Sequence, residues 1–155
     1  MGRPIKAVNV KNLHLTLRFL GQTHPDQIRP VSMVVRRVAG QMFDFDLVGL
    51  GAFPNGRRPR AVWAGVSHAE QAATMVETLR SPLAQLGWLS QGRRWHAHVT
   101  LARVNGKPTA GLFDLLSRYR HTPFGRVTAK SVILMQSQLG QRDAVYVPLD
   151  TVALL

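Results

Sequence analysis

Residues 12–21 read NLHLTLRFLG, and residues 95–104 read WHAHVTLARV, so the pattern His-x-Thr-Leu occurs twice in one short chain. The first copy contains His14 and Thr16, and the second contains His98 and Thr100. Successive side chains of a β-strand point to opposite faces, so a histidine and a threonine two residues apart share one face. We therefore expect two strands whose imidazoles and hydroxyls converge on one ligand.

The surroundings of both copies are typical of strands. Over residues 11–20 the apolar and polar side chains alternate, which predicts a half-buried strand whose leucine face is core and whose histidine face is presented. Arg18 shares the histidine face, whereas Phe19 shares the leucine face. The second copy predicts a strand over residues 98–104.

The rest of the chain follows the same period analysis. We predict helices over about 25–39, 69–86 and 109–119, and strands over 43–53, 60–66, 126–140 and 143–150. Thr23 or Asp26 is the expected cap of the first helix, and Pro82 is expected to kink or break the second. The strands over 43–53 and 60–66 are expected to pair across the turn at 54–59. Each motif strand precedes a helix and a strand pair, which indicates a pseudo-duplicated α+β fold in one domain, residues 1–155.

Composition restricts the partners. The 155 residues carry 20 Lys and Arg against 8 Asp and Glu, a formal net charge of +12 that favours phosphate-bearing partners such as RNA. Cysteine is absent, which excludes thiol catalysis and zinc-thiolate sites. With no apolar leader and no long apolar run, we expect a cytoplasmic protein that does not bind membranes.

Two histidines suit the cleavage of a phosphodiester. In-line displacement at phosphorus needs a base on one side and an acid on the other. An ordinary histidine pKa of about 6.5 lets one imidazole be neutral and another charged near neutral pH. Each positioned acid or base typically contributes about 10²–10⁴-fold in rate. The threonine hydroxyls can donate to the phosphate oxygens, so the chemistry needs no metal.

Simpler interpretations of the same residues compete with this one. A lone strand histidine is more often a solvated or satisfied residue than a catalyst, but packing constrains the leucines and does not explain a repeated polar pattern. His96 and His98 resemble a metal pair, yet no carboxylate or cysteine lies nearby in the sequence, and we expect no metal and no cofactor. The remaining basic clusters are either solvated surface or phosphate contacts: Arg57, Arg58, Arg60, Arg93 and Arg94.

With these residues in place, the sequence resembles the 2H phosphoesterase superfamily, which is named for two His-x-Thr/Ser motifs (HxTx). Within it, the chain is similar to the bacterial and archaeal RNA 2′,3′-cyclic phosphodiesterases, historically called 2′-5′ RNA ligases. The likeness extends to Phe19-Leu20-Gly21 after the first motif and Leu101-Ala102-Arg103 after the second. The stretch ILMQSQLGQRDAVYVPL, residues 133–149, is similar to the C-terminal strand pair of the family.

The resemblance implies a bilobal α+β fold with two antiparallel sheets around a central cleft and helices outside. It implies His14 and His98 as catalytic residues, and Thr16, Thr100 and Arg103 as phosphate-binding residues, without a metal. Strict strand alternation, however, puts Arg103 on the face opposite His98. From the resemblance we expect the N-terminal strand and helix usual in the family to be missing, and a homo-oligomer to cover the resulting sheet edge.

The leading hypothesis is therefore an enzyme that hydrolyses RNA 2′,3′-cyclic phosphate ends, or nucleoside 2′,3′-cyclic phosphates, to 2′-phosphates. His98 is assigned as the base toward water and His14 as the acid toward the leaving 3′-oxygen. One alternative is 2′-5′ RNA ligase activity on tRNA halves, which uses the same site in reverse. The other is a non-catalytic RNA-binding module.

Overall fold

The computed structural model describes residues 5–89, 92, 94–139 and 144–155. Its elements in chain order are β1 (Ile5–Ala7), the 3-10 helix η1 (Val10–Asn12), α1 (Pro25–Val38), β2 (Phe43–Phe53), β3 (Ala61–Ser67), α2 (Glu70–Gln85), β4 (His98–Val104), α3 (Ala110–Arg118), β5 (Pro123–Ala129), β6 (Ser131–Leu139) and β7 (Ala144–Ala153). The predicted α+β class with antiparallel sheets is confirmed.

The chain groups into two units, each assembled from three separate segments. Unit 1 comprises Met1–Thr16, Phe45–Ala69 and His96–Val127. Unit 2 comprises Leu17–Asp44, Glu70–Trp95 and Thr128–Leu155. The two histidines and two threonines of the motifs therefore all belong to unit 1. The assignment of the chain to a single domain, with a central cleft, stays a prediction.

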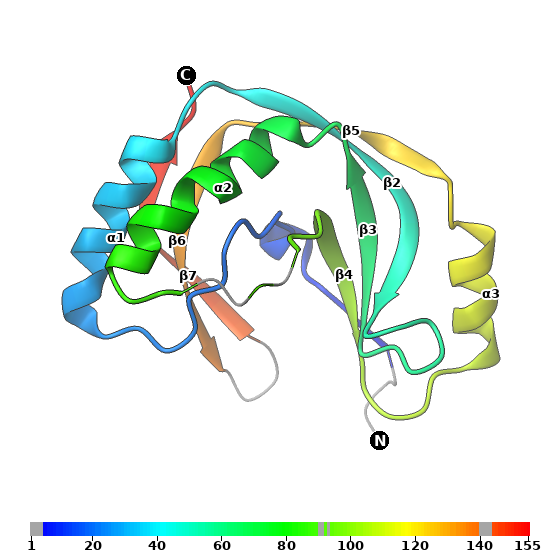
Figure 1. Ribbon diagram of the computed structural model, residues 1–155. Helices are drawn as coiled ribbons and strands as arrows, with labels where there is room; N and C mark the ends of the chain where they lie inside the picture. The colour runs from blue at the N-terminus through cyan, green and yellow to red at the C-terminus, as the bar shows by residue number, and fades with distance from the viewer. Residues whose placement is uncertain (1–4, 90–91, 93, 140–143) are drawn as a thin grey trace. The chain divides into compact units, whose positions relative to one another are not determined.

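Unit 1 is built on a sheet whose strand order is β1-β4-β3-β2-β5 (Figure 1). One face of this sheet is covered by α3, because Leu112 of the helix is buried against Val62, Ala102 and Val104. The alternating sequence of β2 and the short apolar sequence of β3 predicted this pair, and their antiparallel register runs from Asp46–Ser67 to Phe53–Ala61.

A β-bulge in β4 decides which side chains share the other face. Val62 lies opposite Ala102 and the next residue, Trp63, lies opposite Thr100, so Leu101 is the extra residue. A bulge of this kind shifts the side-chain alternation by one residue. Val99, Ala102 and Val104 are consequently buried on one side of β4. The face opposite to them carries His98, Thr100 and Arg103, and we call it the site face.

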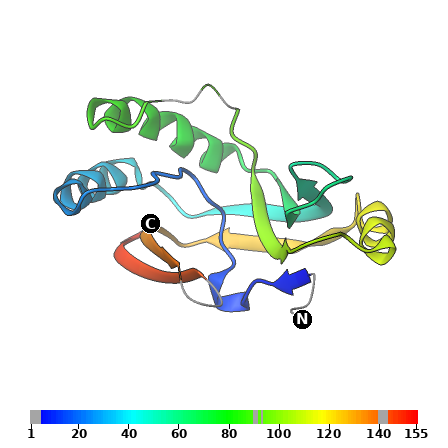
Figure 2. The same cartoon turned by 90° about the horizontal axis from the view of Figure 1, so that it is seen from below.

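Unit 2 packs α1 and α2 together, with the β6–β7 hairpin beside α1 (Figures 1 and 2). Asp150 of β7 accepts hydrogen bonds from Ser32 and Arg36 of α1, and these bonds, that of Ser32 first, hold the pKa of the carboxyl below its ordinary value. The buried core of the unit consists of Val31, Val34, Val35, Leu79 and Leu83.

Both long helices were predicted, but their details differ from the expectations. The cap of α1 is His24, whose main-chain N–H donates to Gln27 Oε1 at 3.0 Å, so neither Thr23 nor Asp26 caps it. Pro82 lies inside α2 and does not break it. Burial of the neighbouring Leu83 and of Leu79, each worth about 1.5–3 kcal/mol, offsets the roughly 3 kcal/mol cost of an interior proline.

One strand prediction in this part of the fold needs correction, and two short elements were not predicted. The single strand expected over 126–140 is two strands, β5 and β6, separated at Lys130. They belong to different sheets, and no local sequence pattern marks that change of partner. β1 and η1 were not predicted, because three residues are too few for a period to emerge. Of the expected joint at 139–143, residues 140–143 lie outside the described part of the chain.

The helices of the described ranges are short or polar in comparison with membrane spans. No helix in residues 5–89, 92, 94–139 and 144–155 combines the length and apolar composition that a membrane span requires.

Candidate functional site

The second motif lies on β4, as predicted. β4 spans His98–Val104, the range expected from the sequence, and it pairs antiparallel with β3 on one side and β1 on the other. His98 and Thr100 are half-buried on the site face, and Val99 between them is only 6% exposed. An interior strand thus positions this motif.

The first motif is not on a strand, and the prediction of a strand over 11–20 is wrong. The chain forms η1 at residues 10–12 and then makes a single β-bridge, between Leu15 and Val99. Leu13 and Phe19 are 39% and 79% exposed, so the expected leucine face is not core along its whole length. The alternation failed because only Leu15 of this stretch has a strand partner.

This single bridge nevertheless brings the two motifs together. Leu15 lies directly opposite Val99 in antiparallel orientation, which places His14 opposite Thr100 and Thr16 opposite His98. Residues directly opposite in such a pair have Cα atoms about 4.5–5.5 Å apart. The four polar side chains point away from the buried Val99, so they gather on the site face. Within unit 1, the two motifs therefore lie side by side with their polar side chains on one face, as predicted.

Both histidines are held in the same way. His14 Nδ1 lies 2.7 Å from the carbonyl oxygen of Asn12, and His98 Nδ1 lies 2.7 Å from that of His96. A carbonyl oxygen only accepts, so Nδ1 of each ring must carry the proton. Nε2 of each ring is then the nitrogen available for proton transfer, as base when the ring is neutral and as acid when it is charged.

An aromatic cluster supports the second histidine. The ring of Phe53 meets the His98 ring edge-on, with centroids 4.9 Å apart and planes at 83°. Trp63 contacts His96 with centroids 4.9 Å apart, and Phe53 contacts both Trp63 and His96. Such edge-to-face contacts contribute about 0.5–1.5 kcal/mol each beyond burial. Sequence analysis missed Phe53 and Trp63, although the predicted pairing of their strands carried the signal.

A glycine makes room for this cluster. A Cβ atom on Gly51 would fall on the indole ring of Trp63, with Cη2 its nearest atom, far inside van der Waals contact. Gly51 is paired with Trp63 across β2 and β3, so the indole lies over the glycine. The absence of a side chain at this position is what allows Trp63 to approach His96 and His98.

Arg103 reaches the site face through the bulge at Leu101. Strict alternation from His98 put Arg103 on the opposite face. That expectation is wrong, because the extra residue Leu101 shifts the alternation by one position and returns Arg103 to the face of His98. Arg103 is exposed, and Lys6 of β1 lies directly opposite it in the antiparallel pair of β1 and β4. The structure thus brings together His14, Thr16, His98, Thr100 and Arg103, the five residues proposed from the sequence.

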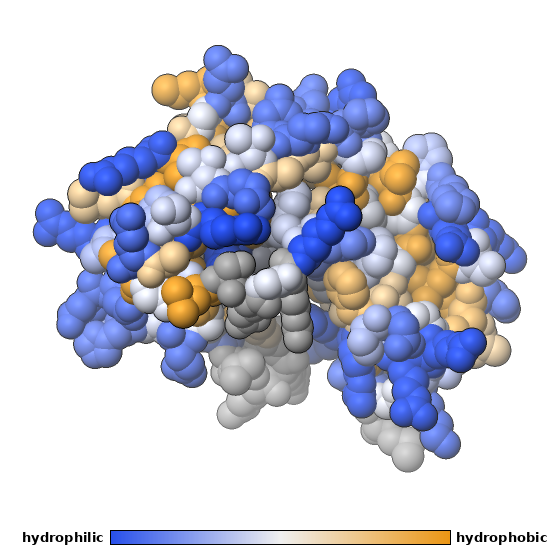
Figure 3. All heavy atoms as spheres, viewed as in Figure 1, coloured by the Kyte–Doolittle hydropathy of each residue, from blue (hydrophilic) through white to orange (hydrophobic). Residues whose placement is uncertain are grey.

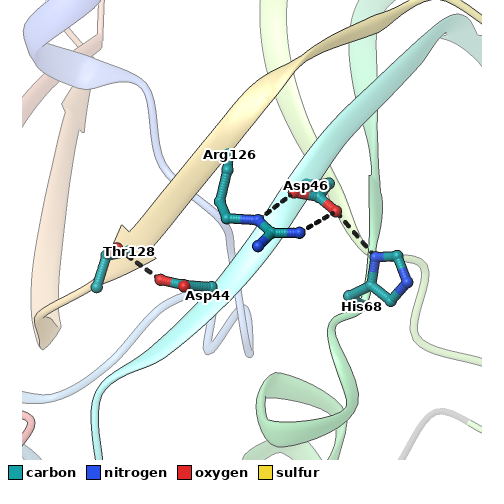
Figure 4. A network of polar contacts seen from close by, with 5 residues as sticks. All are labelled: Asp44, Asp46, His68, Arg126 and Thr128. Carbon is teal, nitrogen blue, oxygen red and sulfur yellow. Dashed lines mark hydrogen bonds and ion pairs between the residues drawn. The ribbon is translucent and has the colours of Figure 1, made fainter.

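A separate polar network lies toward the other end of β2 (Figure 4). Asp46 accepts from Arg126 Nε at 2.8 Å and lies 3.0 Å from His68 Nδ1. The hydrogen bond from Arg126, followed by its charge and by His68, holds the pKa of Asp46 below the ordinary value of 3.8. His68 is exposed and has a positive φ of 55°. Within unit 1 this network ties β5 to β2.

His96 and His98 are neighbours in space, with ring centroids 5.8 Å apart. Within the described residues, however, no three His, Asp or Glu side chains are grouped so that they could hold a metal ion. The independence of metal and cofactor stays a prediction. Of the basic clusters, Arg57, Arg58, Arg60 and Arg94 are exposed, and Arg93 lies outside the described residues.

Comparison with known proteins gives a family. The family model described as the 2′-5′ RNA ligase superfamily matches residues 5–141. A relative from Aeropyrum pernix, named RNA 2′,3′-cyclic phosphodiesterase, is 33% identical over 147 residues, which cover 94% of this chain and 84% of the relative. A relative of the same name from Archaeoglobus fulgidus is 31% identical over 142 residues, covering 92% and 80%.

Solved structures give the same fold. A protein of Thermus thermophilus is similar with a TM-score of 0.82 and 28% identity, covering 98% of this chain and 83% of its own. The Escherichia coli protein LigT, crystallised with 3′-AMP, is similar with a TM-score of 0.75 and 26% identity, covering 97% and 82%.

Proposed function

The chain belongs to the 2′-5′ RNA ligase superfamily, and we propose that it is an RNA 2′,3′-cyclic phosphodiesterase that opens cyclic phosphate ends to 2′-phosphates. The name shared by its relatives supports this activity. The observation that carries the proposal is the bridge between Leu15 and Val99, which sets two His-Thr pairs against each other.

An antiparallel bridge has local two-fold symmetry about the bridged pair. It therefore relates His14 and Thr16 to His98 and Thr100, and the two histidines become diagonal neighbours on one face. A phosphate bound among these four side chains has one imidazole on each side. This is the arrangement that in-line displacement requires, with a base beside the entering oxygen and an acid beside the leaving one.

The proposed steps follow from the fixed Nδ1 hydrogen bonds. Nε2 of neutral His98 accepts a proton from water, whose oxygen attacks phosphorus. The bond between phosphorus and the 3′-oxygen breaks, and Nε2–H of charged His14 donates its proton to that oxygen. The product is a 2′-phosphate with a free 3′-hydroxyl. Thr16, Thr100 and Arg103 donate hydrogen bonds to the phosphate oxygens as negative charge builds up.

The test is hydrolysis of an oligoribonucleotide 2′,3′-cyclic phosphate by the folded protein in EDTA. We expect a 2′-phosphate product and a bell-shaped dependence of kcat/KM on pH, with an optimum roughly between pH 5.5 and 8, because one imidazole must be neutral and the other charged. No 2′-phosphate, or a rate that needs added divalent metal and rises steadily to high pH, would overturn the proposal and indicate metal-bound hydroxide instead.

The same assay separates the alternatives. Ligation of tRNA halves uses the same two histidines in reverse, so the ratio of hydrolysis to ligation rates decides which reaction dominates. An RNA-binding module without turnover would bind RNA equally well after His14→Ala and His98→Ala. Location in the cytoplasm and association into a homo-oligomer remain part of the proposal, to be tested by cell fractionation and by sedimentation of the purified protein.

A further inference from the structure

Two cations lie side by side on the site face of unit 1. Lys6 of β1 is directly opposite Arg103 of β4 in antiparallel register. Since Arg103 shares its face with His98 and Thr100, Lys6 lies on that face as well. Two cations in one row concentrate positive charge, which attracts phosphate-bearing ligands.

The loop between β2 and β3 adds two more cations at the same end of the sheet. Ala61, the first residue of β3, lies opposite Arg103, so the loop leaves the sheet from the row that contains Arg103 and Lys6. Arg57 and Arg58 of this loop are both exposed. Hydrophilic side chains dominate this region of the surface in Figure 3, over the loop that joins β2 and β3 in Figure 1.

The loop presents its arginines from an ordered backbone. Asn55 Oδ1 accepts hydrogen bonds from the main-chain N–H groups of Arg57 and Arg58, both at 3.0 Å. Pro59 behind them is fully buried. A loop that is already ordered loses little conformational entropy when it binds a ligand, so its charges are available at low cost.

Acidic side chains are scarce in this unit. Within unit 1 the described residues include only two of them, Asp46 and Asp114. Asp46 is engaged by Arg126 and His68 and pairs with Ser67, at the far end of β3 from Ala61. Asp114 belongs to α3, which covers the opposite face of the sheet. Neither of these two carboxylates therefore lies on the site face at the Ala61 end of the sheet, where Arg57 and Arg58 are exposed.

We propose that Lys6, Arg57 and Arg58 form a binding surface for the RNA strand that leads to the reacting cyclic phosphate. We call these three residues the basic end. Arg103 lies three residues along β4 from Thr100, which is about 10 Å at the rise of roughly 3.3 Å per residue of a strand. Lys6 lies in the row of Arg103, and the loop that carries Arg57 and Arg58 begins at that row. The basic end therefore lies about this distance from Thr100, where it contacts phosphates upstream of the reacting one. The inference rests on the proposed function, and it makes the preferred substrate an oligonucleotide rather than a nucleoside cyclic phosphate.

The first test needs no variant. The kcat/KM of the wild-type protein is measured against salt for a short oligoribonucleotide 2′,3′-cyclic phosphate and for uridine 2′,3′-cyclic monophosphate. Phosphate contacts along a single strand each contribute a slope of about −0.7 in a plot of log affinity against log salt. We expect three contacts to make the slope for the oligonucleotide steeper by about 2, and equal slopes would overturn the proposal.

The second test removes the charges. In the variant Lys6→Ala, Arg57→Ala, Arg58→Ala, we expect the kcat/KM for the oligonucleotide to fall roughly 10-fold or more at low salt, as lost electrostatic steering and contacts predict. Its value for the mononucleotide should stay unchanged. The matched control is Arg118→Ala, since this exposed arginine ends α3 on the other side of the sheet. An equal loss with both substrates, or no loss with either, would contradict the proposal.

A failure of the proposed function would look different. If the wild-type protein hydrolyses neither substrate, the activity is wrong, and the basic end is then judged by fluorescence anisotropy of a labelled oligoribonucleotide. Weaker binding and a shallower salt slope in the triple variant, but not in Arg118→Ala, would support the surface. Binding that is the same in all three proteins would overturn it.

Discussion

The two motifs have the same local chemistry and very different support. His14 and His98 each donate through Nδ1 to the carbonyl of the residue two positions earlier, at 2.7 Å in both cases. The second motif lies on an interior strand beside Phe53 and Trp63, whereas the first is attached to the sheet by one bridge after a 3-10 turn. Identical short patterns therefore specify the presentation of a side chain, but not the structure that carries it.

The largest expected effect tests whether the two histidines contribute differently to kcat because different structures hold them. We expect His14→Ala and His98→Ala each to lower kcat by about 10²–10⁴-fold, because acid and base are both needed. The double variant should be little worse than the more damaged single variant, since the two groups act as a unit. Single-turnover rates with a cyclic phosphate oligonucleotide measure this. Full activity in either single variant would mean that another group performs its role.

The next effect concerns the aromatic support of the second motif alone. Gly51→Ala places a methyl group inside the ring of Trp63, and overpacking of this kind costs about 1–3 kcal/mol. We expect a lower free energy of unfolding in urea and a lower kcat, because the ring contacts of His98 are displaced.

The matched control for that change is Gly111→Ala. A Cβ atom at Gly111 would meet nothing within 4 Å, and the position lies in α3 of the same unit. Alanine is favoured over glycine in helices by up to about 1 kcal/mol, so this variant should be neutral or more stable. Equal losses in both variants would show that Trp63 does not depend on the empty space at Gly51.

A smaller effect is expected from the side chains of Asn12 and His96, the two residues whose carbonyl groups accept from the histidines. Both acceptors are main-chain atoms, so Asn12→Ala and His96→Ala keep the Nδ1 hydrogen bonds. His96→Ala also removes ring contacts to Phe53 and Trp63 worth about 0.5–1.5 kcal/mol each. We expect a several-fold loss of kcat for His96→Ala and almost none for Asn12→Ala, in steady-state assays at one pH. A larger loss of kcat in Asn12→Ala than in His96→Ala would show that the first motif depends more on its neighbouring side chain than the second motif does.

The smallest effect concerns the stability, at low pH, of the sheet that carries the second motif. The pKa of Asp46 is lowered in the folded protein, first by the hydrogen bond from Arg126. Its contribution to stability is therefore complete above the unfolded pKa and disappears as the pH falls through the lower folded pKa. The difference in melting temperature between wild type and Asp46→Asn should shrink across that acid range. A difference that persists unchanged into strong acid would exclude the charge of Asp46 as its cause.

Much of the architecture could be predicted from local patterns. The strands at 43–53 and 98–104 were predicted with their observed bounds, and α1 was predicted to within one residue. The strand at 43–53 and α1 have long periodic patterns, and the strand at 98–104 repeats the His-x-Thr-Leu motif. The strand over 11–20 was wrong for the opposite reason, because its alternation was real but only Leu15 has a partner. A period shows which faces a segment can offer, and pairing decides whether a strand forms.

The candidate site divides in the same way. The sequence by itself determined four candidate residues, since a repeated polar pattern flanked by apolar positions is visible without any structure, and the family resemblance added Arg103. Only the tertiary structure decided that Arg103 shares a face with His98, because one extra residue at Leu101 reverses the alternation. It also decided that Phe53, Trp63 and Lys6 border the site, since register between distant strands is set by sheet packing and not by neighbours along the chain.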